Sequence, residues 1–161
     1  MNPLADELLA LSWTLIDLNG NQATLRRAVS TAYYALFHLL IADATLNWGR
    51  PEHRPQLGRL FDHGNMRRAS EKVCSDFNRR VKNKKSTPSA VASNLNGVAD
   101  GFIRAQHGRI EADYVTSREW THDEALRMIQ LVKDTTATWR TIREQPEAQA
   151  YLVNMFGNAR L

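Results

Sequence analysis

The sequence has very little cysteine, since Cys74 is the only one among its 161 residues. A single thiol excludes an internal disulfide and any metal site built from several thiolates. We therefore expect a reducing, cytoplasmic setting, with Cys74 acting as a small core residue beside the apolar spacing of Val73 and Phe77.

Long apolar runs are also missing. No run approaches the length that spans a membrane, and the opening MNPLADELLA has neither the basic region nor the cleavage site of a secretion signal. These absences predict a soluble intracellular protein without a membrane partner.

Signatures of metal sites and of activated nucleophiles are lacking as well. The sequence contains no HExxH, no carboxylate and histidine cluster at metal spacing, no GxSxG and no glycine-rich phosphate loop. Ser30 has no recognisable acid partner or oxyanion element. We expect neither a metal nor a cofactor.

What is present is apolar spacing of helical period, with no strand-like alternation, repeat or linker. Five helices are predicted, over residues 3–18, 24–46, 62–81, 86–114 and 121–145. Asn2 is expected to cap the first helix, Asp62 the third, and Thr121 with Glu124 forms a capping box at the start of the fifth. The prediction is one all-α domain, 1–161, folded as an antiparallel up-and-down bundle of about five helices. Residues 145–161 are expected to form a docking helix or a partner-binding tail.

Three of these helices have a readable core edge. Their predicted buried residues are Leu25, Val29, Ala32, Leu36, Leu39 and Leu40; Met66, Ser70, Val73, Phe77 and Val81; and Ala125, Ile129, Val132, Thr136, Trp139 and Ile142. In the fourth helix, Gly97, Gly101 and Gly108 weaken helix propensity, and we expect them to permit close approach of a neighbouring helix.

A polar stripe opposes the apolar face of the second helix and consists of Arg27, Thr31, Tyr34 and His38. A merely solvated face would more readily carry Glu and Lys than a phenol and an imidazole. The stripe is therefore interpreted either as the lining of a functional groove or as an interhelical or dimer contact.

Two charges interrupt the apolar face of the fourth helix. Continuing the rotation of Val98 and Phe102 brings Arg109 and Asp113 onto the inward side. Buried charges are costly unless they are paired and hydrogen-bonded, so this pattern favours a structured polar site. The alternative is a surface or helix-end position, if Gly108 ends the helix early.

Two histidines complete the candidate polar residues. His63 lies at the start of the third helix, where the helix dipole disfavours imidazolium, and a neutral ring is suited to act as a base. His107 lies on the polar side of the fourth helix with Asp100, Arg104 and Glu111. Arg104 and His107 are therefore interpreted either as binding residues or as part of a water-exposed face.

The net charge of +4 and the pI near 9.5 lean toward a polyanionic partner. The basic residues gather toward the end of the third helix, as Arg79, Arg80, Lys82, Lys84 and Lys85, with Arg67 and Arg68 about three turns earlier. Such a run either contacts RNA phosphates or is solvated and favourably placed against the helix dipole.

Three segments, RRAVSTAYYALFH at 26–38, DHG at 62–64 and RIEADY at 109–114, together resemble the HEPN superfamily of helical nucleotide- and RNA-associated proteins. The resemblance spans about residues 20–143. It implies a helical bundle that dimerises so that polar residues of two copies form one cleft, with Arg109, Asp113 and Tyr114 of the third segment among the binding residues.

Catalytic members resemble one another in an arginine followed four to six positions later by a histidine, which is used for metal-independent RNA cleavage. Arg109 matches the arginine, but positions 113–115 are Asp, Tyr and Val. Replacement of that histidine by His63, His38 or His107 across a dimer cleft is a hypothesis, in which one of them would serve as the base and Arg109 would stabilise charge on the phosphate.

The resemblance thus predicts a homodimer that binds nucleotide or RNA in a prokaryotic stress, toxin–antitoxin or defence system. Endoribonuclease activity is left open. The alternative is a noncatalytic interaction module that partners a nucleotidyltransferase or another effector, with Arg109 and Asp113 as structural contacts.

Overall fold

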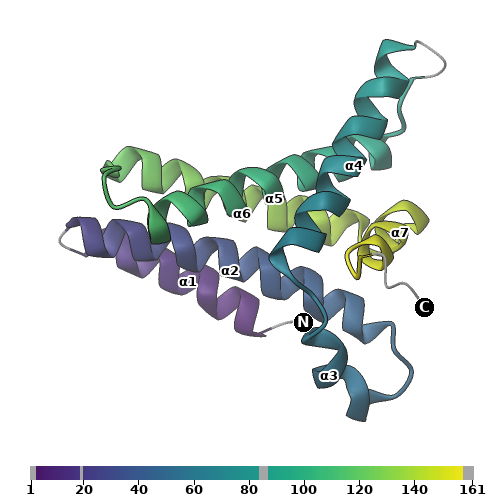
Figure 1. The fold of residues 1–161 in the computed structure, drawn as a ribbon, viewed down its shortest axis with the longest axis horizontal. Coiled ribbons are helices and arrows are strands. Elements are labelled where there is room, and N and C mark those ends of the chain that lie inside the picture. Colours follow the sequence, from purple (N-terminus) through teal and green to yellow (C-terminus); the bar gives the residue numbers. More distant parts are fainter. Residues whose placement is uncertain (1–2, 19, 84–86, 158–161) are drawn as a thin grey trace.

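The computed structural model describes residues 3–18, 20–83 and 87–157, and in this part of the chain the fold is entirely helical (Figure 1). The α-helices are α1 (Pro3–Asp17), α2 (Gln22–Leu46), α3 (Arg54–Gly58), α4 (His63–Lys82), α5 (Ala90–Tyr114), α6 (His122–Ile142) and α7 (Pro146–Asn154), with a 3-10 turn, η1, at Pro51–His53. The all-α prediction is confirmed, and the five expected long helices are joined by two short ones, α3 and α7.

Side-chain caps set where the long helices begin. The carboxylate of Asp62 accepts a hydrogen bond from Asn65 N at 2.7 Å, and Thr121 and Glu124 form the predicted capping box. Asn21 caps α2, which therefore begins two residues before the predicted Thr24. The predicted Asn2 cap lies outside the described residues.

The central helix is α2, which packs against α1, α5 and α6. Its six predicted core residues are all buried, as are the six predicted for α6. By length and composition α2 is apolar enough to cross a membrane, but 72% of its apolar window is buried inside the protein. That burial is what the core helix of a soluble protein shows.

Two of the three glycines in α5 lie where α6 comes closest. A Cβ on Gly101 would lie 2.2 Å from Thr135 Oγ1, and a Cβ on Gly108 would lie 2.7 Å from Met128 Cε. A Cβ on Gly97 would meet nothing within 4 Å. The expected close approach therefore holds at Gly101 and Gly108 and not at Gly97.

The C-terminal half of α4 and the start of α5 project from the bundle as an arm (Figure 1). Met66 and Ser70 are buried as predicted, whereas Val73 and Phe77 are half-buried. Val81 is 49% exposed, so the prediction that it belongs to the core edge is wrong. The apolar spacing continues to the end of the arm, but at Val81 the side chain is exposed to solvent. Cys74 is likewise only half-buried.

The segment after residue 145 contributes to the core. Helix α6 ends at Ile142, and Pro146 begins α7, whose Ala148, Tyr151 and Leu152 are buried. The Tyr151 hydroxyl lies 2.7 Å from Ser70 Oγ on α4. Within 146–154 the expected docking helix therefore packs onto its own chain.

Candidate functional site

Arg109, on the last turns of α5, is drawn into a small polar cluster between α5 and α2. Its side chain is only 12% exposed, and its Nε lies 3.0 Å from Asp113 Oδ2. That Nε makes no hydrogen bond among the described residues, so its contact with Asp113 is an ion pair without directed N–H geometry. The predicted inward orientation of Arg109 is confirmed.

Tyrosines supply the other contacts of Arg109. One Nη donates a hydrogen bond to the Tyr34 hydroxyl at 2.9 Å and a longer one to the Tyr114 hydroxyl at 3.5 Å. The guanidinium carbon lies 5.5 Å from the Tyr34 ring centroid and 5.3 Å from that of Tyr114, within the range of cation–π attraction. Burial opposes the charged form, but the hydrogen bond to Tyr34 and the charges of Tyr34, Tyr114 and Asp113 outweigh it and raise the pKa of Arg109.

His63, the first residue of α4, is fixed by three neighbouring side chains. Its Nδ1 lies 2.6 Å from the buried hydroxyl of Tyr33, and its ring stacks on Phe37 with centroids 4.5 Å apart. Its carbonyl oxygen accepts a hydrogen bond from Gln106 Nε2 at 2.8 Å.

This arrangement selects one tautomer of His63. Burial raises the pKa of Tyr33, so its hydroxyl keeps its proton. Among the described residues, the buried Tyr33 hydroxyl has no hydrogen-bond partner other than His63 Nδ1, and a buried O–H without an acceptor is costly. Tyr33 therefore donates its proton to Nδ1, and neutral His63 carries its own proton on Nε2. In this state His63 offers a hydrogen-bond donor rather than a base.

Both predicted histidines of the cluster favour the neutral form. Burial lowers the pKa of His63, and the positive charge of Arg109 lowers it further against the opposing effect of Asp62. Burial also lowers the pKa of His38, whose ring stacks on Tyr34 with centroids 6.1 Å apart. The pKa of His63 is thus lowered, as the sequence predicted, and burial is the largest cause of the shift.

The residues of the polar stripe of α2 lie in three different surroundings. Tyr34 and His38 belong to the Arg109 cluster, and Thr31 is buried. Arg27 is exposed and, with Asp113, lines a hollow of about 460 Å³ between α2, α5 and α1. Thr31 therefore faces the protein interior and cannot line a groove.

Ser30 has a role that its sequence context did not indicate. Its Oγ donates a hydrogen bond to Asp113 Oδ2 at 3.1 Å, on the same oxygen that faces Arg109. The hydroxyl therefore helps to hold the carboxylate that pairs with Arg109.

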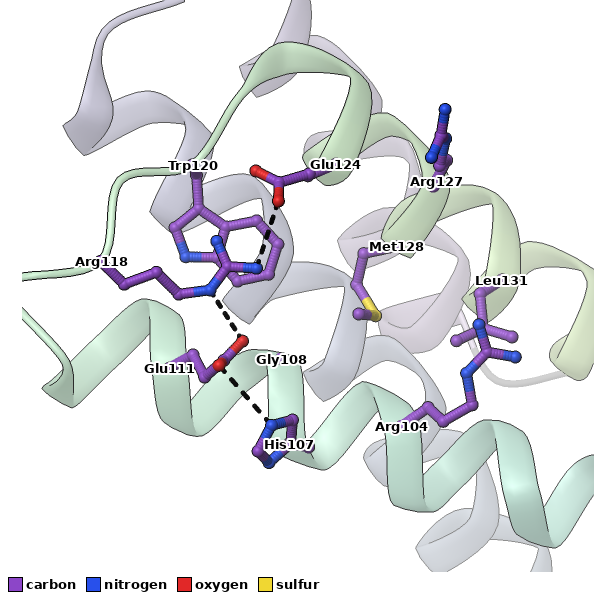
Figure 2. A pocket seen from close by; sticks show the side chains of 10 residues that line it. All are labelled: Arg104, His107, Gly108, Glu111, Arg118, Trp120, Glu124, Arg127, Met128 and Leu131. Atoms are coloured by element: carbon purple, nitrogen blue, oxygen red, sulfur yellow. Dashed lines mark hydrogen bonds and ion pairs between the residues drawn. The ribbon is translucent and has the colours of Figure 1, made fainter.

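Arg104 and His107 lie apart from this cluster, on a shallow hollow of about 200 Å³ between α5 and α6. Figure 2 shows Glu111 between His107 and Arg118, with contacts of 3.6 Å and 2.9 Å. The side chain of His107 is 66% exposed, as the water-exposed interpretation predicted. Arg104 pairs at 3.7 Å with Asp100 on its own helix.

The basic run is also separate from Arg109. Arg79, Arg80 and Lys82 lie at the exposed end of the arm, and Arg79 pairs with Asp76 at 2.7 Å. Lys84 and Lys85 lie outside the described residues. Arg80 lines a hollow with Leu95, which lies 14 positions before Arg109 on α5, so the two regions are roughly 20 Å apart along the helix.

Arg67 lies nearer to the cluster. It pairs with Glu71 at 2.8 Å and reaches Gln106 Oε1 at 3.4 Å, so it contacts the residue that holds the His63 carbonyl.

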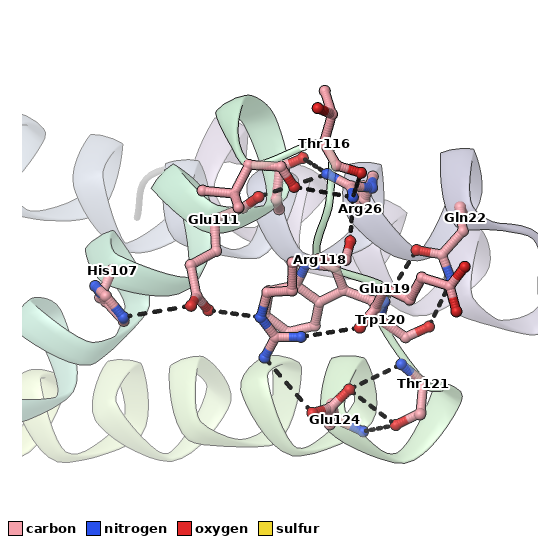
Figure 3. Close-up of polar contacts among 12 residues, drawn as sticks. Gln22, Arg26, His107, Glu111, Thr116, Arg118, Glu119, Trp120, Thr121 and Glu124 are labelled. Carbon is pink, nitrogen blue, oxygen red and sulfur yellow. Dashed lines mark hydrogen bonds and ion pairs between the residues drawn. The ribbon is translucent and has the colours of Figure 1, made fainter.

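Sequence reasoning missed the residues that hold α5 in place. Arg26 donates to the carbonyl oxygens of Ala112 at 2.9 Å, Val115 at 3.1 Å and Arg118 (Figure 3). Gln22 bonds to both backbone groups of Trp120. Arg26 is the first residue of the segment 26–38, but its role could not be predicted, because hydrogen bonds to carbonyls far away in the sequence produce no pattern in residue spacing.

Among the described residues, no three His, Cys, Asp or Glu side chains gather in a way that could hold a metal ion. Comparison with known proteins adds no identification, since no family model, curated protein or solved structure matches this chain.

Proposed function

We propose that this chain is a HEPN-like bundle that acts as a homodimer and binds the phosphates of RNA or a nucleotide at the Arg109 cluster. The supporting observation is that a charged Arg109, buried but for 12% of its side chain, lies beside two histidines whose pKa values are lowered. The prokaryotic stress, toxin–antitoxin or defence setting rests on the sequence resemblance alone.

The chemistry of the cluster suits a phosphate. Arg109 offers charge-assisted donors, and the Nε2–H of His63 adds a neutral donor whose direction is fixed by Tyr33. Tyr34 and Tyr114 present rings next to the guanidinium, on which a base can stack. An arriving phosphate would take over donors that now serve Asp113 and the two tyrosines.

If the bound RNA is cleaved, the roles divide between the histidines. His38 takes the proton of the ribose 2′-hydroxyl, and the resulting oxygen attacks the adjacent phosphorus. The bond to the 5′ oxygen breaks, which leaves a 2′,3′-cyclic phosphate and a 5′-hydroxyl that takes its proton from water. Arg109 and the Nε2–H of His63 stabilise the charge that grows on the phosphate oxygens.

The test is binding of fluorescently labelled RNA and of mononucleotides, with cleavage assayed in EDTA. We expect Arg109→Ala to weaken binding by about tenfold or more, because a charge-assisted hydrogen bond contributes about 1.5–3 kcal/mol. Arg140→Ala is the matched control, since Arg140 is an exposed arginine of α6 that pairs with Asp6. A folded Arg109→Ala protein that binds RNA like the wild type would refute the proposal.

The second candidate is a noncatalytic module that partners a nucleotidyltransferase or another effector. It is favoured by the existing pairing of Arg109 with Asp113 and Tyr34, and by the lack of a histidine four to six positions after Arg109. Under this alternative, Arg109→Ala would unfold the protein or abolish partner binding, and neither variant nor wild type would bind RNA.

A further inference from the structure

The net positive charge of this chain lies in one short segment, the C-terminal half of α4 and the residues that follow it. Residues 71–85 contain six of the 21 lysines and arginines but only two of the 17 acidic residues. The remainder of the chain has fifteen residues of each sign, so this segment carries the whole net charge of +4. The arm in Figure 1 is therefore the strongly basic part of a protein that is otherwise neutral.

The basic side chains of α4 gather on one side of the helix. At 100° per residue, five of them fall within an arc of about 140°, namely Arg67, Arg68, Lys72, Arg79 and Lys82. We call this set the basic face. Ser75 and Asn78 lie between its members and, with Arg79 and Lys82, line a shallow open hollow of about 750 Å³. Met66, Val73 and Phe77, which pack toward the bundle, lie on the opposite side of α4.

Two carboxylates offset part of this charge within α4. The ion pairs are Arg67 with Glu71 at 2.8 Å, and Lys72 and Arg79 with the shared Asp76 at 2.9 Å and 2.7 Å. Arg68 is bonded to the neutral amide of Asn65, and Lys82 has no ion pair among the described residues. The basic face therefore keeps an excess of three positive charges.

Neighbouring helices do not cancel that excess. The α5 side of the arm, residues 87–99, contains no charged residue, and Asp100 pairs with Arg104 on its own helix. On α7, Glu147 lines a hollow with Arg80 and Phe77, on the other side of α4.

The basic face begins beside the Arg109 cluster. Arg67 reaches Gln106 Oε1 at 3.4 Å, and Gln106 holds the His63 carbonyl and precedes Arg109 by three positions. From Arg67 to Lys82 the helix rises by about 22 Å. The positive charges therefore form a row that leads from the cluster to the end of the arm.

We infer that the basic face binds the backbone of an RNA strand, one phosphate of which occupies the Arg109 cluster. The inference rests on the proposed function and makes its ligand an RNA strand rather than a mononucleotide. Lysine and arginine in a row, with serine and asparagine between them, suit a ligand whose phosphates repeat along a strand, and such contacts do not depend on base sequence. A helix that lies on a membrane has large apolar side chains beside its basic ones, whereas only Val81 is apolar among the described residues that line the hollow.

The test uses the full chain and labelled 2′-fluoro oligouridylates of about 4 and about 14 nucleotides, lengths typical of single-strand sites. These probes lack the 2′-hydroxyl and are not cleaved during the titration. The variant with Lys72→Gln, Arg79→Gln and Lys82→Gln should bind the long RNA at least about tenfold more weakly. Its slope of log affinity against log salt should be smaller by about 2, because each phosphate contact to a single strand contributes about 0.7. The short RNA, which fits the Arg109 cluster alone, should bind as it does to the wild type.

The matched control removes the same charge from exposed positions of α6, with Arg127→Gln, Lys133→Gln and Arg140→Gln. This variant should bind both RNAs within about twofold of the wild type, since exposed charges farther away than a Debye length are largely screened. Far-UV circular dichroism and thermal melting verify that each variant is folded.

Arg109→Ala separates this inference from the proposed function, because it should weaken binding of both lengths. Wild-type binding of both RNAs by Arg109→Ala would refute the proposed function. The inference alone would fail if the α4 variant bound the long RNA like the α6 control, or if the wild type bound both lengths equally. It would also fail if phosphatidylserine vesicles or polyglutamate bound through the same three residues more tightly than the long RNA.

Discussion

Arg26 and Arg109 are both arginines removed from water where α2 meets α5, but their guanidinium groups have different partners. Arg26 donates to backbone carbonyls at the end of α5 and in the loop that follows. Within the described residues, the polar partners of Arg109 are all side chains, namely one carboxylate and two tyrosine hydroxyls. Backbone carbonyls can move only if the chain moves, whereas side chains can turn away for a ligand. The first arrangement is therefore structural, and the second is able to exchange partners.

The largest effect should come from removing the structural arginine. Arg26→Ala leaves several carbonyls at the end of α5 without a donor, and we expect the free energy of unfolding to fall by about 2–4 kcal/mol. Chemical denaturation measures this fall. Arg27→Ala, at the exposed neighbouring position, should change stability by less than about 0.5 kcal/mol. Equal losses for both variants would contradict the distinction between the two regions.

Arg109→Ala should have a smaller effect on stability. It removes one partner of a largely buried ion pair, but Ser30 still donates to Asp113, so we expect a loss of about 1–2 kcal/mol. The same denaturation experiment measures it, in parallel with the RNA-binding assay. A loss as large as that of Arg26→Ala would place Arg109 among the structural residues.

Tyr33→Phe tests the donor role of His63. Without the hydroxyl, Nδ1 loses its donor, and we expect neutral His63 to populate both tautomers at a cost of about 0.5–1.5 kcal/mol in stability. Long-range ¹H–¹⁵N NMR of the imidazole distinguishes the tautomers. Tyr34→Phe is the matched control, because it removes a hydroxyl that contacts Arg109 and should leave the His63 tautomer unchanged. A wild-type ring protonated on Nδ1 would contradict the assignment.

The smallest effect should be a dependence of stability on pH. The folded protein lowers the pKa values of His38 and His63 below 6.5, so the unfolded chain binds more protons in that range. Their contribution to stability is complete above about pH 6.5 and is lost as pH falls through the folded pKa values. The pKa values of Asp76 and Glu124 are lowered from their ordinary values of 3.8 and 4.5. Their contributions to the pH dependence of stability therefore fall at more acidic pH than those of the histidines.

Denaturation between pH 7 and 5 measures the histidine contribution. In the wild type, the free energy of unfolding should decrease toward pH 5, and in the variant carrying His38→Gln and His63→Gln this slope should flatten. An unchanged slope in the double variant would assign the dependence to other groups.

Local signals made much of the fold predictable. Asp62 and the Thr121/Glu124 pair cap helices through hydrogen bonds within one turn, so a short stretch of sequence is enough to predict them. The burial of Trp139 followed from helical spacing in the same way. The prediction that Val81 is buried was wrong because apolar spacing shows only which side of a helix is apolar. Whether another helix covers that side depends on the tertiary fold.

The candidate site was predictable in part for a related reason. Arg109 was identified because a charge on an apolar face is a conflict that spacing reveals. The partners of His63 were not identified, since Tyr33 and Gln106 reach it from 30 and 43 positions away. The same distance in sequence hid the bonds from Arg26 to the end of α5.

The hydrogen bonds that Arg26 and Gln22 make to residues 112–120 limit where this chain can gain or lose residues. They fix the final turn of α5 against the first turn of α2, and Arg109 lies only three residues before Ala112. Inserting or deleting one residue just after Ala112 would break this bracing and shift the alignment of the two helices. We expect variation in length to be tolerated better at the far end of α5, because a change there would alter the arm without misplacing Arg109.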